Sequence, residues 1–312
     1  MRQLVTTMIF FFMLFFFLSC EREISLDISD EQKLVLLSNF NPDSSFRLTL
    51  STTIPITRAL GQEPAYPNNA QIQLFEDGNS CGDFVYDQGD AVRSPFYYLD
   101  KKPEVGKDYM IKISVEDFPD ISANNQVPPA VGIGAFSLID SMHLQEDNPD
   151  LFFYVFRALL QVDRPVVDSL QYFHITAFRM VREFTIVGND TLWTMHKKSL
   201  ALEAPVSEDI RTIFHEKGFL LKGSYFDSHQ DKIALELSFF HNRAKETGGT
   251  VYLALRHVSK DYFLFHQSIG EQEVQGASEN ILSTEAYFIY NNVQGGIGNF
   301  GAYHEVLDSL KY

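Results

Sequence analysis

Cysteine is almost absent from this chain of 312 residues, which contains only Cys20 and Cys81. Two cysteines exclude the disulfide framework that many small exported domains use in place of a large core. Basic residues are also scarce, because 25 Lys and Arg stand against 41 Asp and Glu. The resulting net charge of −16 repels phosphate backbones, and no basic patch interrupts it. The composition therefore argues against a nucleic-acid-binding protein.

Long apolar runs are missing except at the N-terminus, which reads MRQLVTTMIFFFMLFFFLSC. The apolar part, residues 4–18, is shorter than the roughly 20 residues of a spanning helix. It follows Arg2 and contains no acid, as is typical of an export signal. Phe17-Leu18-Ser19-Cys20 resembles the lipobox of bacterial lipoproteins, in which the chain is cut before the cysteine and the thiol is acylated. An ordinary signal peptide with an incidental cysteine is the alternative.

These features predict a lipoprotein signal peptide at residues 1–19, lipidation of Cys20 and a polar tether at residues 20–27. Each buried CH₂ contributes about 0.8 kcal/mol, so two or three acyl chains, palmitate among them, anchor a protein stably. We therefore expect a water-soluble body held at a membrane by lipid. Glu21 and Glu23 resemble the surface-export signal of Bacteroidetes lipoproteins, which favours the outer membrane and its exterior face.

Alternation of apolar and polar residues dominates the rest of the chain. It is clearest in the segments 46–52, 108–115, 232–240 and 250–258. Period two is what a half-buried antiparallel strand requires, because successive side chains point to opposite faces. Clusters of Gly, Asn, Asp and Pro separate these runs as turns. The sequence therefore predicts an all-β fold.

Pro128 and Pro129 mark the predicted boundary between two domains, because proline removes backbone donors and keeps the preceding residue extended. We expect an immunoglobulin-like β-sandwich at residues 28–128 and a larger β-rich domain at residues 129–312. Two short helices are predicted within the larger domain. They cover residues 207–218 and 259–270, each starting at a serine and stopping at a glycine.

Two short motifs match catalytic or cofactor signatures without the context that these signatures need. Gly296–Gly301 matches G-x-G-x-x-G, but 11 residues follow it, too few for the helix and strand of a dinucleotide site. Gly78–Gly82 matches G-x-S-x-G, but it joins two short β runs rather than a strand and a helix. Cys81 lacks a neighbouring His or basic residue that would activate its thiol. We expect no cofactor and no catalytic residue here.

Metal ligation has one weak set of candidates in Asp227, His229 and Asp231. Their alternate positions share one face if the backbone is extended. A zinc or calcium site would need further ligands from elsewhere, so a solvated turn is the favoured interpretation. Trp193 is the single tryptophan, which weakly disfavours a carbohydrate-binding platform.

The order of several segments resembles a known family. After the lipobox come QKLVLLSNF, NNAQIQLFEDG, VGKDYMIKISV and VPPAVGIG, and later SKDYFLFHQS and NNVQGGIGNFGAY. This order is similar to the Bacteroidetes lipoprotein family of domain of unknown function 4249 (DUF4249), over nearly the whole mature chain. The family has no established activity, so the resemblance transfers no catalytic residue. Its genes often lie beside TonB-dependent receptors, which implies a role in transport.

We therefore expect a non-catalytic accessory or ligand-binding partner of a TonB-dependent outer-membrane transporter. Its partners would be the membrane, through the lipid, a receptor barrel, and a small molecule or peptide of unknown identity. One alternative is a structural or adhesive surface protein, which predicts a shallow surface or a broad apolar patch. Another is a surface hydrolase whose site assembles from scattered residues, which predicts a deep pocket with shifted pKa values.

Overall fold

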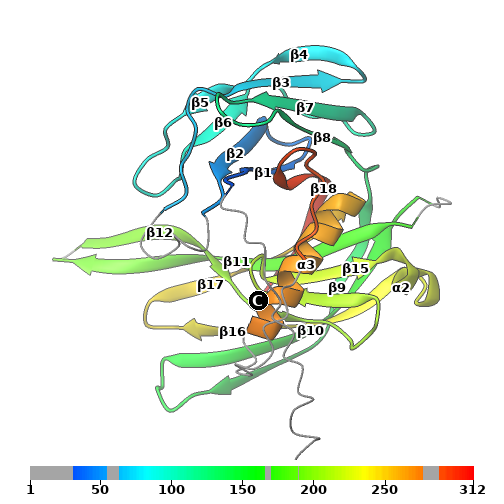
Figure 1. Cartoon of the computed structure of the whole chain (residues 1–312). Helices are drawn as coiled ribbons and strands as arrows, with labels where there is room; N and C mark the ends of the chain where they lie inside the picture. The colour runs from blue at the N-terminus through cyan, green and yellow to red at the C-terminus, as the bar shows by residue number, and fades with distance from the viewer. Residues whose placement is uncertain (1–30, 55–62, 166–169, 189, 277–287) are drawn as a thin grey trace, which may run out of the picture. The chain divides into compact units, whose positions relative to one another are not determined.

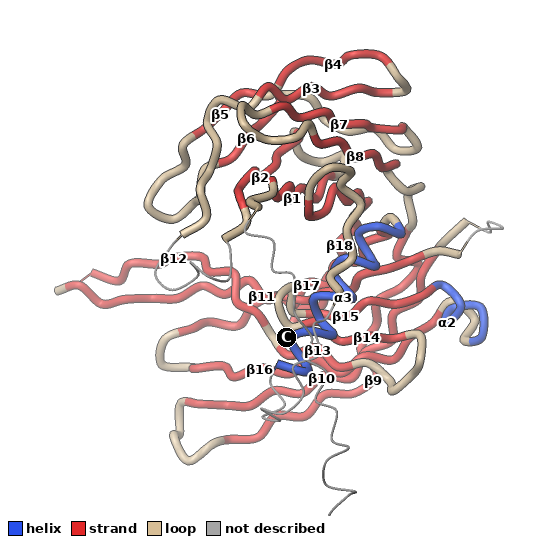
Figure 2. The backbone as a smooth tube through the Cα atoms, in the orientation of Figure 1, coloured by secondary structure: helices blue, strands red, loops and turns tan. Residues whose placement is uncertain are grey.

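The computed structural model describes most of the chain (Figure 1). The described residues are 31–54, 63–165, 170–188, 190–276 and 288–312. Strands make up most of this part and helices are short, which confirms the predicted all-β class (Figure 2). The predicted signal peptide, Cys20 and the tether lie outside the described residues.

A β-sandwich with its own hydrophobic core forms what we call the first lobe. Its strands are β1 (Leu34–Phe40), β2 (Phe46–Thr52), β3 (Gln71–Glu76), β4 (Asn79–Asp83), β5 (Val85–Asp87), β6 (Phe96–Leu99), β7 (Asp108–Ser114) and β8 (Ile121–Gln126). One layer has the order β1-β2-β6-β5 and the other the order β4-β3-β7-β8. Aromatic rings from both layers meet in the core, where the Phe46 ring lies 5.0 Å from that of Tyr109. All of these strands lie between residues 34 and 126.

The β3–β4 turn shows why the G-x-S-x-G match is not a nucleophile elbow. Asp77 and Gly78 have φ values of +47° and +83°, the positive values that a two-residue hairpin turn requires. The following residues form β4, which pairs antiparallel with β3. The segment is therefore a hairpin, as the sequence predicts.

What we call the second lobe packs two further sheet layers around a separate core. Its strands are β9 (Gly132–Gln145), β10 (Leu151–Asp163), β11 (Tyr172–Val187), β12 (Asp190–Ser199), β13 (Ala201–Glu203), β14 (Ile210–Ile213), β15 (Gly218–Lys222), β16 (Lys232–Asn242) and β17 (Glu246–Val258). One layer has the order β13-β16-β10-β9. The other contains β14-β15-β11-β17, with β12 on the distal half of β11.

The last strand, β18 (Ile297–Lys311), belongs to both lobes. Its first half runs parallel to β1, from Val35↔Ile297 to Phe40↔Ala302. Its second half runs antiparallel to β17 and ends at Thr250↔Lys311. Val293, Phe300 and Ala302 lie in the core of the first lobe, although the sequence places them in the domain 129–312. A boundary at residue 128 therefore does not separate the residues of the two cores.

The glycines of the G-x-G-x-x-G match serve this close strand pairing. Gly298 has a φ of +125°, and a Cβ atom there would lie 1.9 Å from the carbonyl oxygen of Leu36. Only glycine allows both the conformation and the approach of the neighbouring backbone. The motif lies in strand β18 and not in a βαβ unit.

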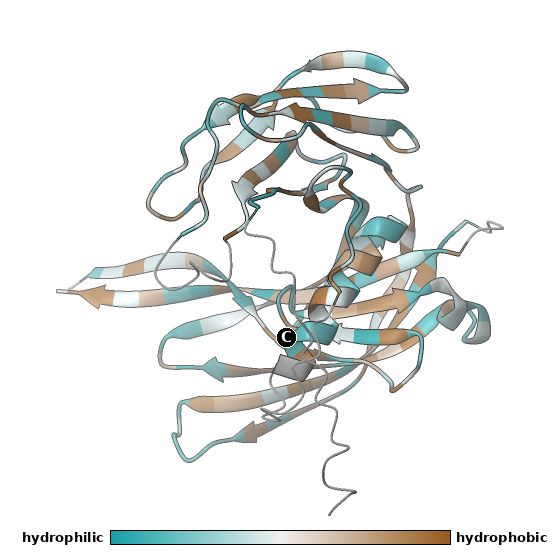
Figure 3. Cartoon of the chain, in the orientation of Figure 1, coloured by the Kyte–Doolittle hydropathy of each residue, from teal (hydrophilic) through white to brown (hydrophobic). Residues whose placement is uncertain are grey.

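The predicted strands occur where the alternation places them, as β2, β7, β16 and β17. Their inward-facing residues are buried, for example Leu48 on β2 and Leu237 on β16. Figure 3 shows hydrophobic and hydrophilic residues alternating along many of the strands. Burial of one face thus explains the pattern.

Helix prediction succeeds once and fails once. The predicted helix at 259–270 is α3 (Lys260–Gly276), which packs on the sheet through Tyr262 and Phe263. The predicted helix at 207–218 is wrong, because that segment forms β14, a turn and the first residue of β15. A short helix, α2 (Gly223–Ser228), occurs instead just after β15. Neither described helix combines the length and apolar character needed to cross a membrane.

Ser207, at the start of the predicted helix 207–218, forms a local turn instead of a helix cap. The Ser207 hydroxyl accepts a hydrogen bond from the backbone N–H of Asp209 at 3.2 Å, and Ile210 N–H donates to the Ser207 carbonyl. This local turn uses the same side-chain acceptor as a helix cap. Ile210 and Ile213 then lie on opposite faces of β14, in two different core clusters. Pairing with β15 decided between helix and strand.

Candidate functional site

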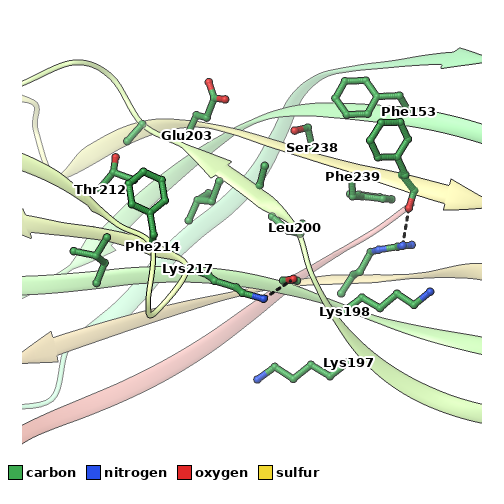
Figure 4. A pocket seen from close by; sticks show the side chains of 18 residues that line it. Phe153, Lys197, Lys198, Leu200, Glu203, Thr212, Phe214, Lys217, Ser238 and Phe239 are labelled. Carbon is green, nitrogen blue, oxygen red and sulfur yellow. Dashed lines mark hydrogen bonds between the residues drawn. The ribbon is translucent and has the colours of Figure 1, made fainter. Parts of the chain in front are cut away.

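A groove opens in the second lobe beside the crossing from β12 to β13 (Figure 4). Its volume of about 1080 Å³ is at the upper end of the range for small-ligand sites. Basic, apolar and hydroxyl-bearing side chains line it, with Glu203 as the acidic one. The lining includes Phe153, Arg179, Lys197, Lys198, Ser199, Leu200, Glu203, Phe214, Lys217, Phe239 and Phe240.

One wall of the groove is formed by the segment that passes from β12 in one sheet layer to β13 in the other. β12 pairs with β11 up to Ser199, and Ala201–Glu203 pairs with β16 of the other layer. Leu200 lies at the crossing and is buried. Every residue from Lys197 to Ala204 lines the groove. The groove is therefore set by sheet topology rather than by a mobile loop.

The β14–β15 turn supplies Lys217 from the opposite side. Lys217 has a φ of +54°, a conformation that is uncommon for residues other than glycine. Gly218 follows because a Cβ there would lie 2.2 Å from the Ile175 carbonyl oxygen. The Lys217 ammonium donates a hydrogen bond to the Ser199 hydroxyl at 3.1 Å, drawn in Figure 4. This contact links the turn to the end of β12 across the groove.

A buried ion cluster lies at the basic end of the groove. The Arg179 side chain is 4% exposed and donates to Glu246 Oε2 at 2.8 Å and to the Phe240 carbonyl at 2.6 Å. Lys198 donates to Glu246 Oε1 at 2.5 Å and also pairs with Glu183. The charges of Arg179 and Lys198 are thus matched by two carboxylates.

Protonation states in the cluster follow from burial and from these partners. Burial raises the pKa of Glu246, but the hydrogen bond from Lys198 and the charge of Arg179 outweigh it, so this pKa lies below its ordinary value. Burial lowers the pKa of His241 below its ordinary value despite the nearby Glu246 carboxylate. His241 Nδ1 lies 3.3 Å from Glu246 Oε2 but is not aligned for a hydrogen bond. We therefore treat His241 as neutral at pH 7.

Aromatic side chains form the apolar part of the groove. The rings of Phe153 and Phe240 lie 5.0 Å apart, and Phe240 is 52% exposed. Phe214, at the β14–β15 turn, is 61% exposed. Leu200 and Phe239 are buried beneath them. The groove therefore combines accessible rings with the basic end.

A second polar cluster lies under helix α3. Glu273 accepts a hydrogen bond from His215 Nδ1 at 3.1 Å, and His215 Nε2 accepts one from His266 Nδ1 at 2.9 Å. His266 Nε2 accepts from the Asn39 side-chain amide at 3.2 Å. This assignment of protons leaves both imidazoles neutral. Burial, to which the positive charge of Arg256 adds, lowers the pKa of His266 to about 3.

The histidine cluster has a structural role. His266 is 3% exposed, and its hydrogen bonds tie α3 to β1 and to the β14–β15 turn. None of the described contacts of His215 and His266 reaches a Ser, Thr or Cys nucleophile. The cluster therefore lacks the nucleophile–base pair of a hydrolase.

Serine and threonine hydroxyls contact imidazoles at Ser228–His229 and Thr194–His196. Each pair consists of close sequence neighbours. His229 Nδ1 donates to the Tyr225 carbonyl at 2.7 Å, so that nitrogen does not accept the Ser228 proton. His196 Nε2 also lies 3.4 Å from Glu183. Neither pair has the third orienting group of a catalytic triad.

The weak metal candidates at residues 227–231 have protein partners. Arg164 pairs with both Asp227 and Asp231, at 2.6 Å for the second. The His229 ring stacks on Tyr225 at 3.9 Å between centroids. Within the described residues, no three side chains of His, Cys, Asp or Glu gather as a metal site would require. Ion pairing with Arg164 therefore explains why the Asp227 and Asp231 carboxylates lie close together.

Cys81, the other sequence candidate, is half-buried on β4 with its sulfur 3.7 Å from Glu76 Oε2. Burial raises the pKa of this thiol, and the Glu76 carboxylate adds to the effect although Lys101 opposes it. A raised pKa lowers the thiolate fraction at pH 7.

Comparison with known families gives one match. The family described as domain of unknown function (DUF4249) matches residues 21–307. The chain belongs to the DUF4249 family. No curated protein matches it. The DUF4249 match begins directly after Cys20 and includes both lobes and nearly all of β18.

Sequence reasoning did not single out the groove residues of this DUF4249 protein. Lys197, Lys217 and Phe240 come from three separate segments, and no spacing relates them. Phe214 lies in the segment 207–218, where the sequence predicts a helix and the structure has a hairpin turn. The Lys197-Lys198 pair stands out in a strongly acidic chain, but Lys101-Lys102 forms the same pair outside the groove.

Proposed function

We propose that this DUF4249 protein is a lipid-anchored, non-catalytic binding protein of the outer membrane that holds a ligand for a TonB-dependent transporter. The observation that carries the proposal is the groove of about 1080 Å³ with its exposed phenylalanines and basic end. A rigid, open groove formed by strands of two sheet layers suits binding and release. The expected ligand is a small molecule or a peptide.

Anchoring through Cys20 supports the accessory role. Acyl chains on that sulfur keep the body at the membrane, and residues 20–27 form the connection. A short flexible link raises the effective concentration of a tethered module to roughly millimolar. Weak contacts with a neighbouring transporter are then sufficient. The surface-export resemblance of Glu21 and Glu23 favours the exterior face.

A non-catalytic role is supported by the chemistry of the groove. The Glu246 carboxylate is committed to Arg179 and Lys198, and Glu203 is accompanied by Ser and Thr hydroxyls without a histidine in the lining. Hydrolysis would need an activated nucleophile or water at that place. A surface hydrolase is therefore the weaker alternative.

Isolation of the protein from its native membranes tests the accessory role. We expect the full-length chain, solubilised in mild detergent, to co-purify with a large β-barrel. The Cys20→Ala variant is the control, and it should move to the soluble fraction and lose the barrel. Purification of the acylated chain alone, under conditions that preserve other outer-membrane complexes, would contradict the proposal.

A structural or adhesive role is the second candidate, favoured by one observation. Beyond Glu183, β11 has β12 as its described neighbour, and Ile186, Trp193 and Met195 are exposed on one face of this hairpin. Such an apolar surface suits a protein contact. If adhesion is the function, Trp193→Ser should reduce cell–cell attachment while Lys217→Gln leaves it unchanged. Equal attachment by both variants and the native protein would exclude this role for the hairpin.

A further inference from the structure

The charge of the groove differs from that of the chain. The protein carries a net charge of −16, but four cations and one acid line the groove. Arg179 and Lys198 are matched by Glu246 and Glu183. Lys197 and Lys217 have no carboxylate partner among the described residues. Two uncompensated ammonium groups therefore line the groove.

The contacts of these two lysines leave donors available. Lys217 donates to the Ser199 hydroxyl at 3.1 Å, and an ammonium group has three donors. The Lys197 ammonium lies 4.0 Å from the centre of the Phe178 ring, which supplies no lone-pair acceptor. An anionic group at this end would accept charge-assisted hydrogen bonds from both.

Accessible aromatic rings complete the pattern. Phe240, whose ring lies against Phe153, and Phe214 expose about half or more of their surface within the lining. Removing such surface from water favours an apolar or flat body in the ligand. Uncharged polar side chains are few in the lining, namely Ser199, Thr212 and Ser238. A neutral sugar would therefore lack most of the partners that its hydroxyls need.

Resting on the proposed binding function, we infer that the groove takes an amphiphilic organic anion. Its carboxylate, sulfonate or phosphate group binds Lys197 and Lys217 beside Ser199, and its apolar body covers Phe214 and Phe240. Charge complementarity selects the head group, and the rings select the body. The groove therefore does not take free inorganic anions, cations or neutral sugars as its main ligands.

Two dyes with the same aromatic skeleton test the class. Anilinonaphthalene sulfonate carries an anion, whereas phenylnaphthylamine is neutral, and both fluoresce on binding. We expect the sulfonate to bind the purified mature protein saturably and at least tenfold more tightly than the neutral dye. In the double variant Lys197→Gln/Lys217→Gln its Kd should rise about tenfold, with the neutral dye unaffected. Lys102→Gln, an exposed lysine of the first lobe, is the matched control.

Further variants and competitors locate the site and the head group. Phe240→Ser should weaken both dyes, whereas Trp193→Ser, on the β11–β12 hairpin, should change neither. Octanoate should displace the sulfonate and octanol should not, while phenyl phosphate compared with benzoate distinguishes a phosphate from a carboxylate head. Displacement by inorganic phosphate as strong as that by octanoate would overturn the role of the apolar body.

The outcomes separate this inference from the binding function itself. If both dyes bind equally and the lysine variant changes neither, while Phe240→Ser abolishes both, the groove binds ligands but the anionic class is wrong. If neither dye binds the native protein, or if Trp193→Ser alone removes binding, the groove is not the ligand site and the proposed function loses its basis.

Discussion

The two lobes are both built from sheets, but they use their apolar residues differently. In the first lobe, rings such as Phe40 and Phe46 are almost completely buried, 5.0 Å apart. In the second lobe, large apolar residues are exposed along the long strands, for example Ile139 on β9 and Met195 on β12, whereas exposed Val92 and Val105 of the first lobe lie between strands. The proposed function places the ligand contacts in the second lobe, where the groove lies.

The histidines are also distributed unequally along the chain. All nine histidines of the chain lie between His143 and His304, outside the predicted first domain. His174, His241, His257 and His266 are buried, and burial lowers the pKa of each. A cavity of about 500 Å³ in the first lobe is lined instead by surface charges such as Glu76 and Lys101. The second lobe is therefore the part sensitive to mild acid.

The largest expected effect comes from the core of the first lobe. Phe300→Ala removes a ring that lies 4.6 Å from that of Phe40 and is completely buried. The free energy of unfolding should fall by about 3–5 kcal/mol. Phe240→Ala, on the rim of the groove, should change it by less than about 0.5 kcal/mol. Denaturant titration of both variants measures the difference, and equal losses would contradict the placement of Phe300 in the core and of Phe240 on the rim of the groove.

The second-largest loss of stability is expected when a buried ion pair is broken, and it should exceed the loss from a more accessible pair. Glu246→Gln leaves Arg179 buried without its carboxylate and should cost about 3 kcal/mol, the low end for such pairs because Lys198 is partly exposed. Glu76→Gln, which breaks a more accessible pair with Lys101 in the first lobe, should cost about 1 kcal/mol. Thermal and denaturant unfolding of the two variants checks the order. A larger loss for Glu76→Gln would reverse this comparison.

Mild acid should weaken the second lobe selectively. Because folding lowers the pKa of His266 to about 3, the unfolded chain binds protons that the folded chain does not. The stabilising effect of the neutral imidazole is therefore complete above pH ~6.5 and is lost as the pH falls from there toward 3. At pH 5.5 this loss should cost about 1 kcal/mol for His266.

Hydrogen exchange at pH 7.5 and 5.5, corrected for intrinsic rates, measures this effect strand by strand. Protection should decrease in β11, β16 and β17 and hold in β3 and β7. Replacing His196, an exposed residue, should leave the pattern unchanged. Uniform loss of protection in both lobes would show that the buried histidines are not the cause.

The smallest effect is expected at Cys81. Its thiol is half-buried beside Glu76, so Cys81→Ser should alter stability by less than about 1 kcal/mol. Because burial raises the pKa of the thiol, alkylation by iodoacetamide at pH 8 should be slower than that of a free cysteine peptide. Mass spectrometry of the time course measures the rate. A faster reaction would identify an activated thiol in the first lobe.

Much of the fold was predictable because alternation records which face of a strand is buried. Ile111 and Leu237 lie inward, as their positions in the pattern require. The turn at Asp77-Gly78 was equally predictable, because this residue pair readily adopts the positive φ values that the hairpin needs. The helix predicted at 207–218 failed because Ile210 and Ile213 satisfy a helical spacing as well as the two faces of a short strand.

The candidate site was not predictable in the same way. Lys197 and Lys217 are 20 residues apart, and they meet in one groove only because β12 crosses to the other layer and the β14–β15 turn folds over it. The contact of Lys198 with both Glu183 and Glu246 likewise follows from the pairing of β11 with β17, in which Glu183 faces Glu246. Such contacts depend on register, which local patterns do not contain.

The amino-acid sequence by itself determined the all-β class, most of the strands and their buried faces, the hairpin turn of β3–β4 and the membership in the DUF4249 family. These features are local, because each depends on which neighbours along the chain are apolar, small or conformationally free. Tertiary structure alone decided that β18 serves both lobes, that residues 207–218 form a hairpin and that a basic, aromatic groove exists. Those features depend on which distant strands pair, and pairing is selected by the burial of whole sheets rather than by any one segment.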